Sequence, residues 1–433
     1  MDFVRGFGGV IALMFIAWLL SSDRRRFPWK IVIGGLVLQW ALALFILKTD
    51  LGDAIFTRIA ELVKSVLDGA MAGATFVGEM VTPEKTPWFI NVGVIILSTI
   101  VFISMLASIG YYFGILQRVV RGMAWVMRKS MGVSGAESLA AAANVFLGQT
   151  EAPLLVRPYI PTMSRSELMA MMTGGFATVA AGVLFVYVRM LEDAAGGLNL
   201  DITRHLLTAC LMSAPGAFVM AKIMVPPTAT IDSDVEGVSG SSDDVVVNVA
   251  KPGENLLDAM TEGASQGMKL AINVLAMLIA FVALIHLVDA GLGVIGSQAW
   301  FAPTLEWLGL KTLSLSGLLG LVFRPVAMMI GIETKDSGQI ASLIGTSMAT
   351  NEIIAYKGLA AMVKDHTVSD RSVYLTLYAL CGFANLSSIG IQIGGISPMA
   401  PGRRAELARL APRAMLGGAM ACWMTAAIAS TLI

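Results

Sequence analysis

Two glutamates stand out in this sequence because each interrupts a stretch that is otherwise apolar enough to lie in a membrane. Glu151 follows Gln149 and Thr150, and Glu352 follows Asn351. A carboxylate at the centre of a spanning helix costs about 2.5–3.5 kcal/mol on insertion scales, so it is usually retained to line a cavity, to pair or to bind a ligand. The plainer alternative is a glutamate that reaches water at the mouth of a loop. The polar neighbours of both residues favour a ligand site.

A second group of polar residues, close to the C-terminal end, could complete such a site. Ser387 and Ser388 follow Asn385, and a serine in a membrane helix often bonds only to the carbonyl four residues back. The primary amides of Asn385 and Gln149 are harder to satisfy in that way, because each brings two donors and an acceptor. Phe383 is either a core aromatic or a surface for a ring or a sugar. Beside interrupted helices, these amides indicate ligand binding.

The same interruptions could hold a cation. A broken helix leaves backbone carbonyls unpaired, and such carbonyls suit a hard cation such as sodium. Asn144 precedes the first interruption and Thr178 lies on the helix that follows it. Their side-chain oxygens are suitably placed to help, although a helix–helix hydrogen bond is the alternative for Asn144.

The composition places most of the chain in lipid. Of its 433 residues, 56% are hydrophobic and 14% are charged, against about 45–50% and about 25% in ordinary soluble domains. Thirty basic and thirty acidic residues give a net charge of zero, which argues against nucleic acid as a partner. The dispersed cysteines and histidines, and the lack of a Walker A sequence or nucleophile elbow, indicate neither an enzyme nor an ATP-driven pump. A transporter is favoured, and a channel is the alternative.

Hydropathy predicts an all-α polytopic membrane protein with about eight spanning helices. Each stretch approaches the roughly 20 apolar residues that a span needs. The predicted spans are residues 8–21, 31–47, 90–113, 168–190, 202–224, 269–287, 373–396 and 411–433. Residues 54–72 have the pattern of an amphipathic helix on the membrane surface. Arginine clusters after the first and third spans and before the last one place those ends in the cytoplasm.

Two further segments, residues 136–161 and 340–363, contain the glutamates and read as re-entrant hairpins. About 25 residues at 1.5 Å per residue are too few for two full spans but enough for two half-length arms. A Gly-Phe-Ala triplet follows each hairpin, at 175–177 and at 382–384. The predicted topology gives the two triplet helices opposite orientations. Such an inverted repeat is typical of secondary transporters.

These features predict five units along the chain. They are a scaffold part with the first spans and the surface helix (1–114), a first transport half with hairpin 1 (115–224), a flexible cytoplasmic linker (225–264), a scaffold helix (265–300) and a second transport half with hairpin 2 (301–433).

Three motifs resemble a known family. GQTEAPLLVRPY at 148–159, NEIIAY at 351–356 and GFANLSSIGI at 382–391 are similar to motifs of the concentrative nucleoside transporters, and the short N-terminus resembles the bacterial members. The resemblance implies eight spans plus two hairpins, with broken helices in the transport domain. It also implies a homotrimer in the bacterial inner membrane, and a transport domain that moves like an elevator against a scaffold.

The resemblance also implies roles for individual residues. The nucleobase would be read by Gln149, Thr150 and Glu151, with Val183 nearby. The ribose would be bound by Glu352, Asn385 and Ser388, with Phe383 beside the sugar. Sodium would be held by the side chains of Asn144 and Thr178 and by the carbonyls of Leu147 and Val179.

The expected function is therefore sodium-coupled nucleoside symport into the cell, with no cofactor besides the coupling ion. Proton coupling is the alternative, and the presence of both Asn144 and Thr178 favours sodium. The sequence does not distinguish a preference for purines from one for pyrimidines.

Overall fold

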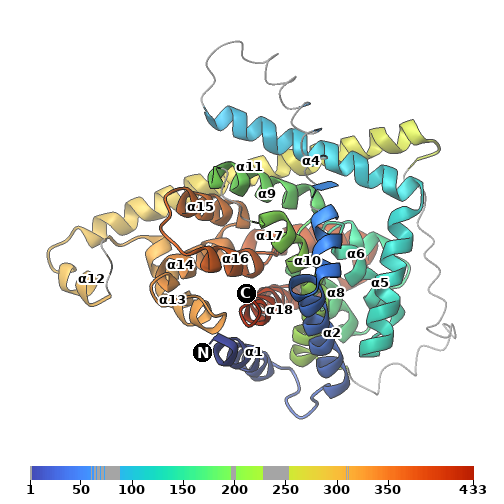
Figure 1. Cartoon of the computed structure of the whole chain (residues 1–433), viewed down its shortest axis with the longest axis horizontal. Coiled ribbons are helices and arrows are strands. Elements are labelled where there is room, and N and C mark those ends of the chain that lie inside the picture. Colours follow the sequence, from blue (N-terminus) through green and yellow to red (C-terminus); the bar gives the residue numbers. More distant parts are fainter. Residues whose placement is uncertain are drawn as a thin grey trace.

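The computed structural model describes residues 2–59, 61, 62, 65, 69, 73, 88–196, 201–227, 253–308, 310 and 312–433. Within these residues the regular elements are all helices, which confirms the all-α class (Figure 1). The first half contains α1 (Asp2–Leu19), α2 (Trp29–Lys48), α4 (Trp88–Tyr112), α5 (Ile115–Met131), α6 (Gly135–Asn144), α7 (Ala152–Leu155), η1 (Ile160–Thr162), α8 (Arg165–Ala177), α9 (Ala181–Ala195) and α10 (Ile202–Met224). The second half contains α11 (Leu256–Gly296), α12 (Ala302–Leu308), α13 (Leu315–Met329), α14 (Ser337–Ala349), α15 (Glu352–Lys364), α16 (Asp370–Ala379), α17 (Leu386–Ile396), η2 (Ser397–Met399), η3 (Pro401–Arg403) and α18 (Arg404–Ala429).

By length and composition, three of the described helical stretches could each cross a membrane. They are Trp29–Lys48, Arg165–Ala195 and Ile202–Met224. A fourth is a pair, Leu97–Tyr112 with Ile115–Met131, whose two helices meet at 79°. The count of eight spans stays a prediction.

The core of the molecule is a bundle of α8, α10 and α18, with α2 packed antiparallel to α10. At one end of this pair the Ser22 N–H donates to the Met224 carbonyl at 2.9 Å. In the middle, Gln39 is fully buried, and its Nε2 donates to the Met212 carbonyl at 2.9 Å and to Thr425 Oγ1 on α18 at 3.1 Å. One polar side chain thus joins three helices, a common device where lipid gives helices no hydrophobic reason to associate.

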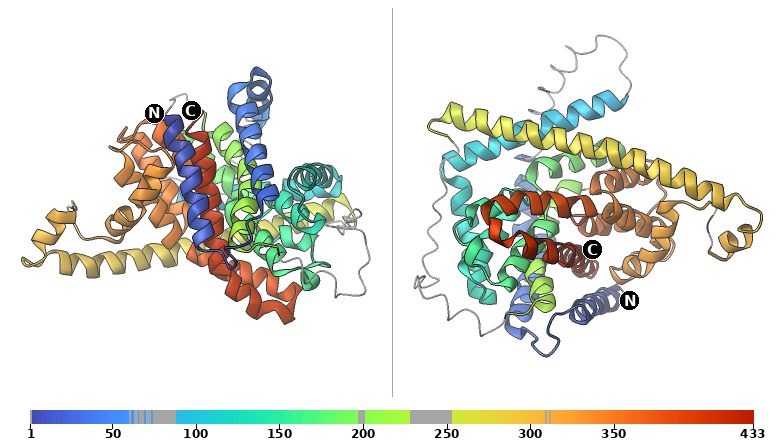
Figure 2. Two further views of the ribbon diagram at one scale, coloured as in Figure 1. Left: turned by 90° about the horizontal axis from the view of Figure 1, so that it is seen from below. Right: turned by 180° about the vertical axis from the view of Figure 1, so that it is seen from behind.

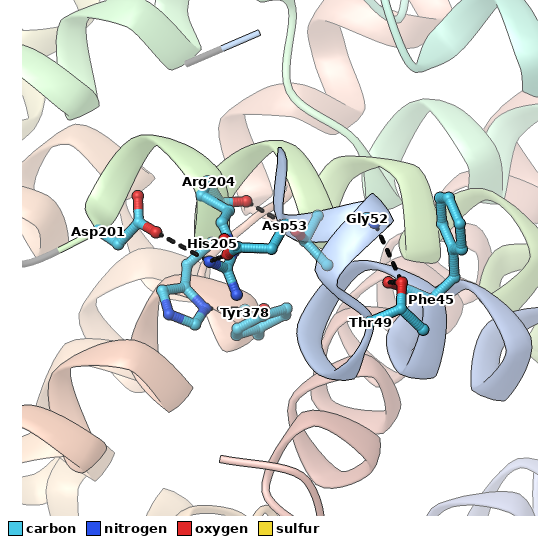
Figure 3. Close-up of polar contacts among 9 residues, drawn as sticks. Phe45, Thr49, Gly52, Asp53, Asp201, Arg204, His205 and Tyr378 are labelled. Atoms are coloured by element: carbon cyan, nitrogen blue, oxygen red, sulfur yellow. Dashed lines mark hydrogen bonds and ion pairs between the residues drawn. The ribbon is translucent and has the colours of Figure 1, made fainter. Parts of the chain in front are cut away.

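Figure 3 shows the other end of the α2–α10 pair. Arg204 on α10 forms ion pairs with Asp53 and with Asp201, the second at 3.3 Å. The neighbouring His205 has its Nδ1 2.9 Å from the hydroxyl of Tyr378 on α16. These contacts fix α10 both to the segment after α2 and to a helix of the second half.

Helices α4 and α11 form a separate closely packed pair along one side of the bundle. Figure 2 shows α11, in yellow, running across the whole width beside α4 in cyan. Gly263 and Gly267 of α11 lie against α4: a Cβ on Gly263 would be 2.6 Å from Ser108 Cβ, and one on Gly267 would be 2.8 Å from Ser104 Cβ. Small residues four apart on both helices allow this close approach.

The helices of the first predicted unit pack in two places. Helices α1 and α2 contact α10 and α18, whereas α4 runs along α11. Helix α11 begins at Leu256, inside the predicted linker (225–264), and is capped by Asn255, whose Oδ1 accepts from the Asp258 N–H at 2.9 Å. The five-unit division stays a prediction. Much of the predicted surface helix at 54–72 lies outside the described residues.

The two segments predicted as hairpins are built differently. In the second segment, α14 and α15 are separated only by Thr350 and Asn351. In the first segment, α6 is followed only by α7 and the short η1, because the prolines at 153, 158 and 161 each lack the N–H that a longer helix needs. We keep the names hairpin 1 and hairpin 2 for residues 136–161 and 340–363, and their re-entrant course stays a prediction.

The helices that follow the hairpins are both broken, as the resemblance implied. The first breaks at 178–180, between α8 and α9, and the second at 380–385, between α16 and α17. The two breaks touch: a Cβ on Gly382 would lie 2.6 Å from the Phe176 carbonyl oxygen. Cys422 on α18 donates to the carbonyls of Ala177 at 3.3 Å and Cys381 at 3.1 Å. The Gly-Phe-Ala triplets therefore lie at the crossing of the two halves.

Candidate functional site

The carboxylate of Glu352 is buried where α9, α15 and α17 meet. Its Oε1 accepts a hydrogen bond from the Tyr187 hydroxyl at 2.9 Å, and its Oε2 accepts one from Nδ2 of Asn385 at 2.7 Å. A carboxylate offers about four lone-pair positions. Two of them remain for donors of a ligand, and hydrogen bonds to an ionised acceptor are the stronger kind.

The orientation of this cluster is fixed by helix caps. Asn385 caps α17: its Oδ1 accepts from the Ser388 N–H at 2.8 Å and from Ser387 Oγ at 2.6 Å, so its amide nitrogen faces Glu352. Asn351 caps α15 in the same way, with Oδ1 accepting from the Ile354 N–H at 3.1 Å. Glu352 occupies the first turn of α15, where the helix dipole favours a negative charge.

Tyr187 is a functional candidate that the sequence reading missed. It stacks on Tyr356 with ring centroids 4.0 Å apart and an interplanar angle of 11°, and both rings are fully buried. The signal was available, since a buried tyrosine hydroxyl normally finds a partner. Val183, which the resemblance did identify, lies four residues earlier in α9 and therefore on the same helix face.

We expect Tyr187→Phe to raise the half-saturating ligand concentration by roughly tenfold, because the carboxylate loses a donor that orients it. Tyr356→Phe is the matched control. It removes a hydroxyl from the same ring stack, but that hydroxyl donates to the Leu377 carbonyl at 3.4 Å and not to Glu352. The measurement is the concentration dependence of uptake by both variants, and an equal effect in the two would show that Tyr187 does not act through Glu352.

The tip of hairpin 1 brings two more predicted residues, Gln149 and Thr150, to the broken helices. A Cβ on Gly175 of α8 would lie 3.0 Å from Gln149 Cβ, and one on Gly395 of α17 would lie 2.5 Å from Thr150 Cγ2. The Glu151 carboxylate folds back against Gly148, where any side chain would collide with it. The tip is thus inserted between the two halves.

Two helix ends, a buried amide and a hydroxyl gather on the other side of this tip. Helices α6 and α8 end at Asn144 and Ala177, and helix ends carry unpaired carbonyls and negative partial charge. Asn144 is fully buried, and neither its Oδ1 nor its Nδ2 has a hydrogen-bond partner in the described part of the chain. Thr178 Oγ1 donates to the Gly174 carbonyl at 2.9 Å, which leaves its lone pairs unused.

Asn144 and Thr178 belong to one location. A Cβ on Gly174 would lie 3.2 Å from Asn144 Nδ2, so Asn144 faces the end of the helix to which Thr178 bonds. The tip is tied to the same break, since the Ala181 N–H donates to the Phe146 carbonyl at 3.4 Å. A buried amide without a partner is costly, and a bound cation would satisfy its oxygen.

The remaining predicted residues lie in these two breaks and in the turn after α6. Val179 is buried between α8 and α9, and Leu147 is half-buried in the turn after α6. Phe383 is half-buried in the second break, and its carbonyl accepts from the Asn385 N–H at 2.9 Å.

Paired hairpins inserted between crossed broken helices, with a buried polar site at the crossing, define a secondary transporter. The chain belongs to the Na+ dependent nucleoside transporter family. The family's N-terminal model matches residues 8–79, its C-terminal model matches residues 205–430, and a nucleoside recognition (Gate) model matches residues 93–194. The resemblance to concentrative nucleoside transporters is thereby confirmed. This family consists of transporters and not of enzymes. Membership in it supports nucleoside transport as the activity of this chain.

Several relatives extend over almost the whole chain. An uncharacterized transporter of Haemophilus influenzae is 39% identical, covering 98% of this chain and 96% of its own. Human solute carrier family 28 member 3 is 37% identical over 98% of this chain, which spans 59% of that longer protein. A solved structure of CNTnw in an inward-facing, substrate-bound state is 35% identical, covers 100% of this chain and 98% of its own, and superposes with a TM-score of 0.85.

Proposed function

We propose that this protein is a sodium–nucleoside symporter that imports nucleosides by an elevator movement. The observation that carries the proposal is the position of hairpin 1. At one side of its tip, Asn144, which has no partner in the described residues, lies near Thr178, and the other side presents Gln149 and Thr150 to the broken helices. A cation that binds beside Asn144 and Thr178 therefore also fixes the part of the tip that faces the broken helices.

This shared tip gives a physical basis for coupling. If sodium raises the affinity for nucleoside, nucleoside must raise the affinity for sodium by the same factor. A neutral nucleoside gains nothing from the membrane potential by itself, whereas one accompanying positive charge gains about 2.3 kcal/mol per 100 mV. The cation therefore supplies the driving force.

The nucleoside roles follow the chemistry of each group. Glu352 would accept from the ribose hydroxyls with the acceptor positions that Tyr187 and Asn385 leave open, and Ser388 and Phe383 would lie beside the sugar. Gln149, Thr150 and Glu151, with Val183, would contact the base. Asn144 and Thr178 would hold sodium together with the carbonyls of Leu147 and Val179.

The elevator proposal is supported by the division of the fold into two packed groups. The close α4–α11 pair is suited to be the static scaffold, and the bundle around α8, α10 and α18, with both hairpins, is suited to be the moving unit. Solved structures of CNTnw in outward-facing and intermediate states match this chain with TM-scores of 0.84–0.86. In this proposal α1 and α2 travel with the moving unit, unlike in the sequence-based division.

We further propose that the protein is a homotrimer in the bacterial inner membrane. The 41-residue α11 exposes large apolar side chains such as Ile272, Ile279 and Leu287 along its length, which supports burial against lipid or against other copies. Native mass spectrometry in detergent tests the trimer directly, and a predominant monomer would contradict it.

The experiment that tests symport is uptake of labelled uridine into proteoliposomes. An inward sodium gradient should drive accumulation above the external concentration, and choline with an inward proton gradient should not. Equal uptake in choline would refute sodium coupling and favour the proton alternative. Uptake that never exceeds the external concentration would instead indicate a channel.

A further inference from the structure

An apolar groove with a basic end lies outside the transport site, between α2 and the last turn of α5. Its volume is about 390 Å³, and it is lined by Lys30, Ile33, Val37, Leu38, Ala41 and Ser130. The two helices touch at its floor, where a Cβ on Gly34 would lie 2.5 Å from the Ser130 carbonyl oxygen. The groove is therefore open along α2 and closed at its base.

The charge of the groove is concentrated at one end. A Cβ on Gly132, directly after α5, would lie 3.0 Å from Lys30 Nζ. Lys129 directly precedes the groove residue Ser130 in α5 and is exposed, with its Nζ 5.0 Å from the centre of the Trp125 ring. Helix α5 carries four basic and no acidic residues, and within the described part of the chain no carboxylate pairs with Lys30 or Lys129.

The apolar part continues away from these lysines. Ile33 and Val37 are 54% and 61% exposed, and together with Ala41 they follow one face of α2 at helical spacing. A groove with cationic groups at one end and an apolar length beyond it matches an amphiphile with an anionic head and a hydrocarbon chain.

We propose that this groove binds an anionic glycerophospholipid from the leaflet that the arginine clusters assign to the cytoplasm. The phosphate lies at Lys30 close to Ser130, Lys129 on the same end of α5 adds positive charge, and one acyl chain follows Ile33, Val37 and Ala41. Basic residues near the membrane surface attract anionic lipids strongly. An exposed tryptophan, such as Trp125, suits the membrane interface. A zwitterionic lipid lacks the net charge, and a soluble anion lacks the chain.

The bound lipid would hold α2 against α5 next to the start of hairpin 1. Only Gly132, Val133 and Ser134 separate α5 from α6, and α6 ends at Asn144. The lipid thus supports the base of the arm that carries the cation site, so its loss should appear as lower thermal stability.

The test is lipid binding to the purified full chain in detergent, measured by native mass spectrometry and thermal unfolding. Phosphatidylglycerol is compared with phosphatidylcholine of the same acyl chains and with soluble glycerol 3-phosphate. We expect phosphatidylglycerol alone to bind and to raise the melting temperature. In K30Q/K129Q its apparent affinity should fall by about tenfold or more, since each basic residue near the surface contributes several-fold.

Two further variants locate the site. Lys335→Gln removes an exposed lysine of a distant loop, paired with Glu333, and should respond like the wild type. Ala41→Trp obstructs the apolar length and should weaken phosphatidylglycerol binding with both lysines intact. Equal binding of the two lipids, an equal response to glycerol 3-phosphate, or an unchanged affinity in K30Q/K129Q or in Ala41→Trp would each overturn the proposal. None of these readouts depends on nucleoside transport.

Discussion

Replacing Glu352 by glutamine is expected to lower nucleoside affinity about 100-fold while the protein remains folded. The glutamine oxygen can accept from Asn385 Nδ2, and its amide can donate to the Tyr187 hydroxyl, which is able to accept when it no longer donates. The cap interactions of Asn385 and Asn351 do not involve the lost charge. The local structure is therefore preserved.

The loss comes from the ligand side. Two ribose hydroxyls would lose charge-assisted hydrogen bonds worth about 1.5 kcal/mol each, and about 3 kcal/mol corresponds to roughly two powers of ten. Calorimetric titration with uridine measures this loss of affinity. The exposed Glu262, which only bonds to Gln266 on the same helix at 2.9 Å, offers a matched control, and Glu262→Gln should bind normally.

Deoxynucleosides make this prediction specific to the ribose. The wild type should reject a nucleoside that lacks a ribose hydroxyl. When that hydroxyl is missing, the buried group that would bond to it is left without a partner. Glu352→Gln should lose most of this discrimination. If the variant binds uridine as the wild type does, or weakens deoxy and ribo forms equally, the ribose role of Glu352 is wrong.

Asn144→Ala is expected to raise the sodium concentration for half-maximal uptake at least about tenfold, and to abolish most of the stabilisation by sodium. Sodium that binds only the folded protein stabilises it in proportion to the logarithm of its concentration above Kd. Without sodium, the variant should be about as stable as the wild type. It loses a small amount of stability to the cavity that the shorter side chain leaves, but it no longer buries an amide without partners.

The control for Asn144 is Thr173→Ala. Thr173 is also fully buried, and its Oγ1 also has no hydrogen-bond partner in the described residues, but it packs against Gly417 of α18, on the other side of α8 from hairpin 1. Melting temperature and uptake are measured against sodium, with choline keeping ionic strength constant. A sodium curve that is unchanged in Asn144→Ala, or shifted equally in Thr173→Ala, would refute the ligand assignment.

Much of the site could be predicted because its residues conflict with their local surroundings. Glu151 and Glu352 are charges in apolar stretches, and Asn385 is an amide in an apolar stretch. The conflict between such a group and its apolar neighbours is visible in the local sequence. Tyr187 does not conflict with an apolar helix in the same way, and its importance arises only from a partner 165 residues away.

Some elements of the fold could not be predicted for a related reason. Helix α5 is a mixture of apolar and basic residues, too polar for a span, and the sequence reading used it only to assign an orientation. The segment 136–161 was predicted to form two half-length arms, and its second part contains only α7 and the short η1. The breaks at 178–180 and 380–385 lie in stretches whose hydropathy is continuous, and only the family resemblance pointed to them.

The amino-acid sequence alone was enough to predict a helical membrane protein and to identify the polar residues that are out of place in its apolar stretches. These are local properties, set by hydropathy and by the cost of burying charge. The tertiary structure decided which helices are neighbours: α1 and α2 lie with α10 and α18, and α4 lies with α11. An apolar face satisfies lipid and protein equally well, so the choice of partner rests on shape and on a few hydrogen bonds between distant residues, such as those of Gln39.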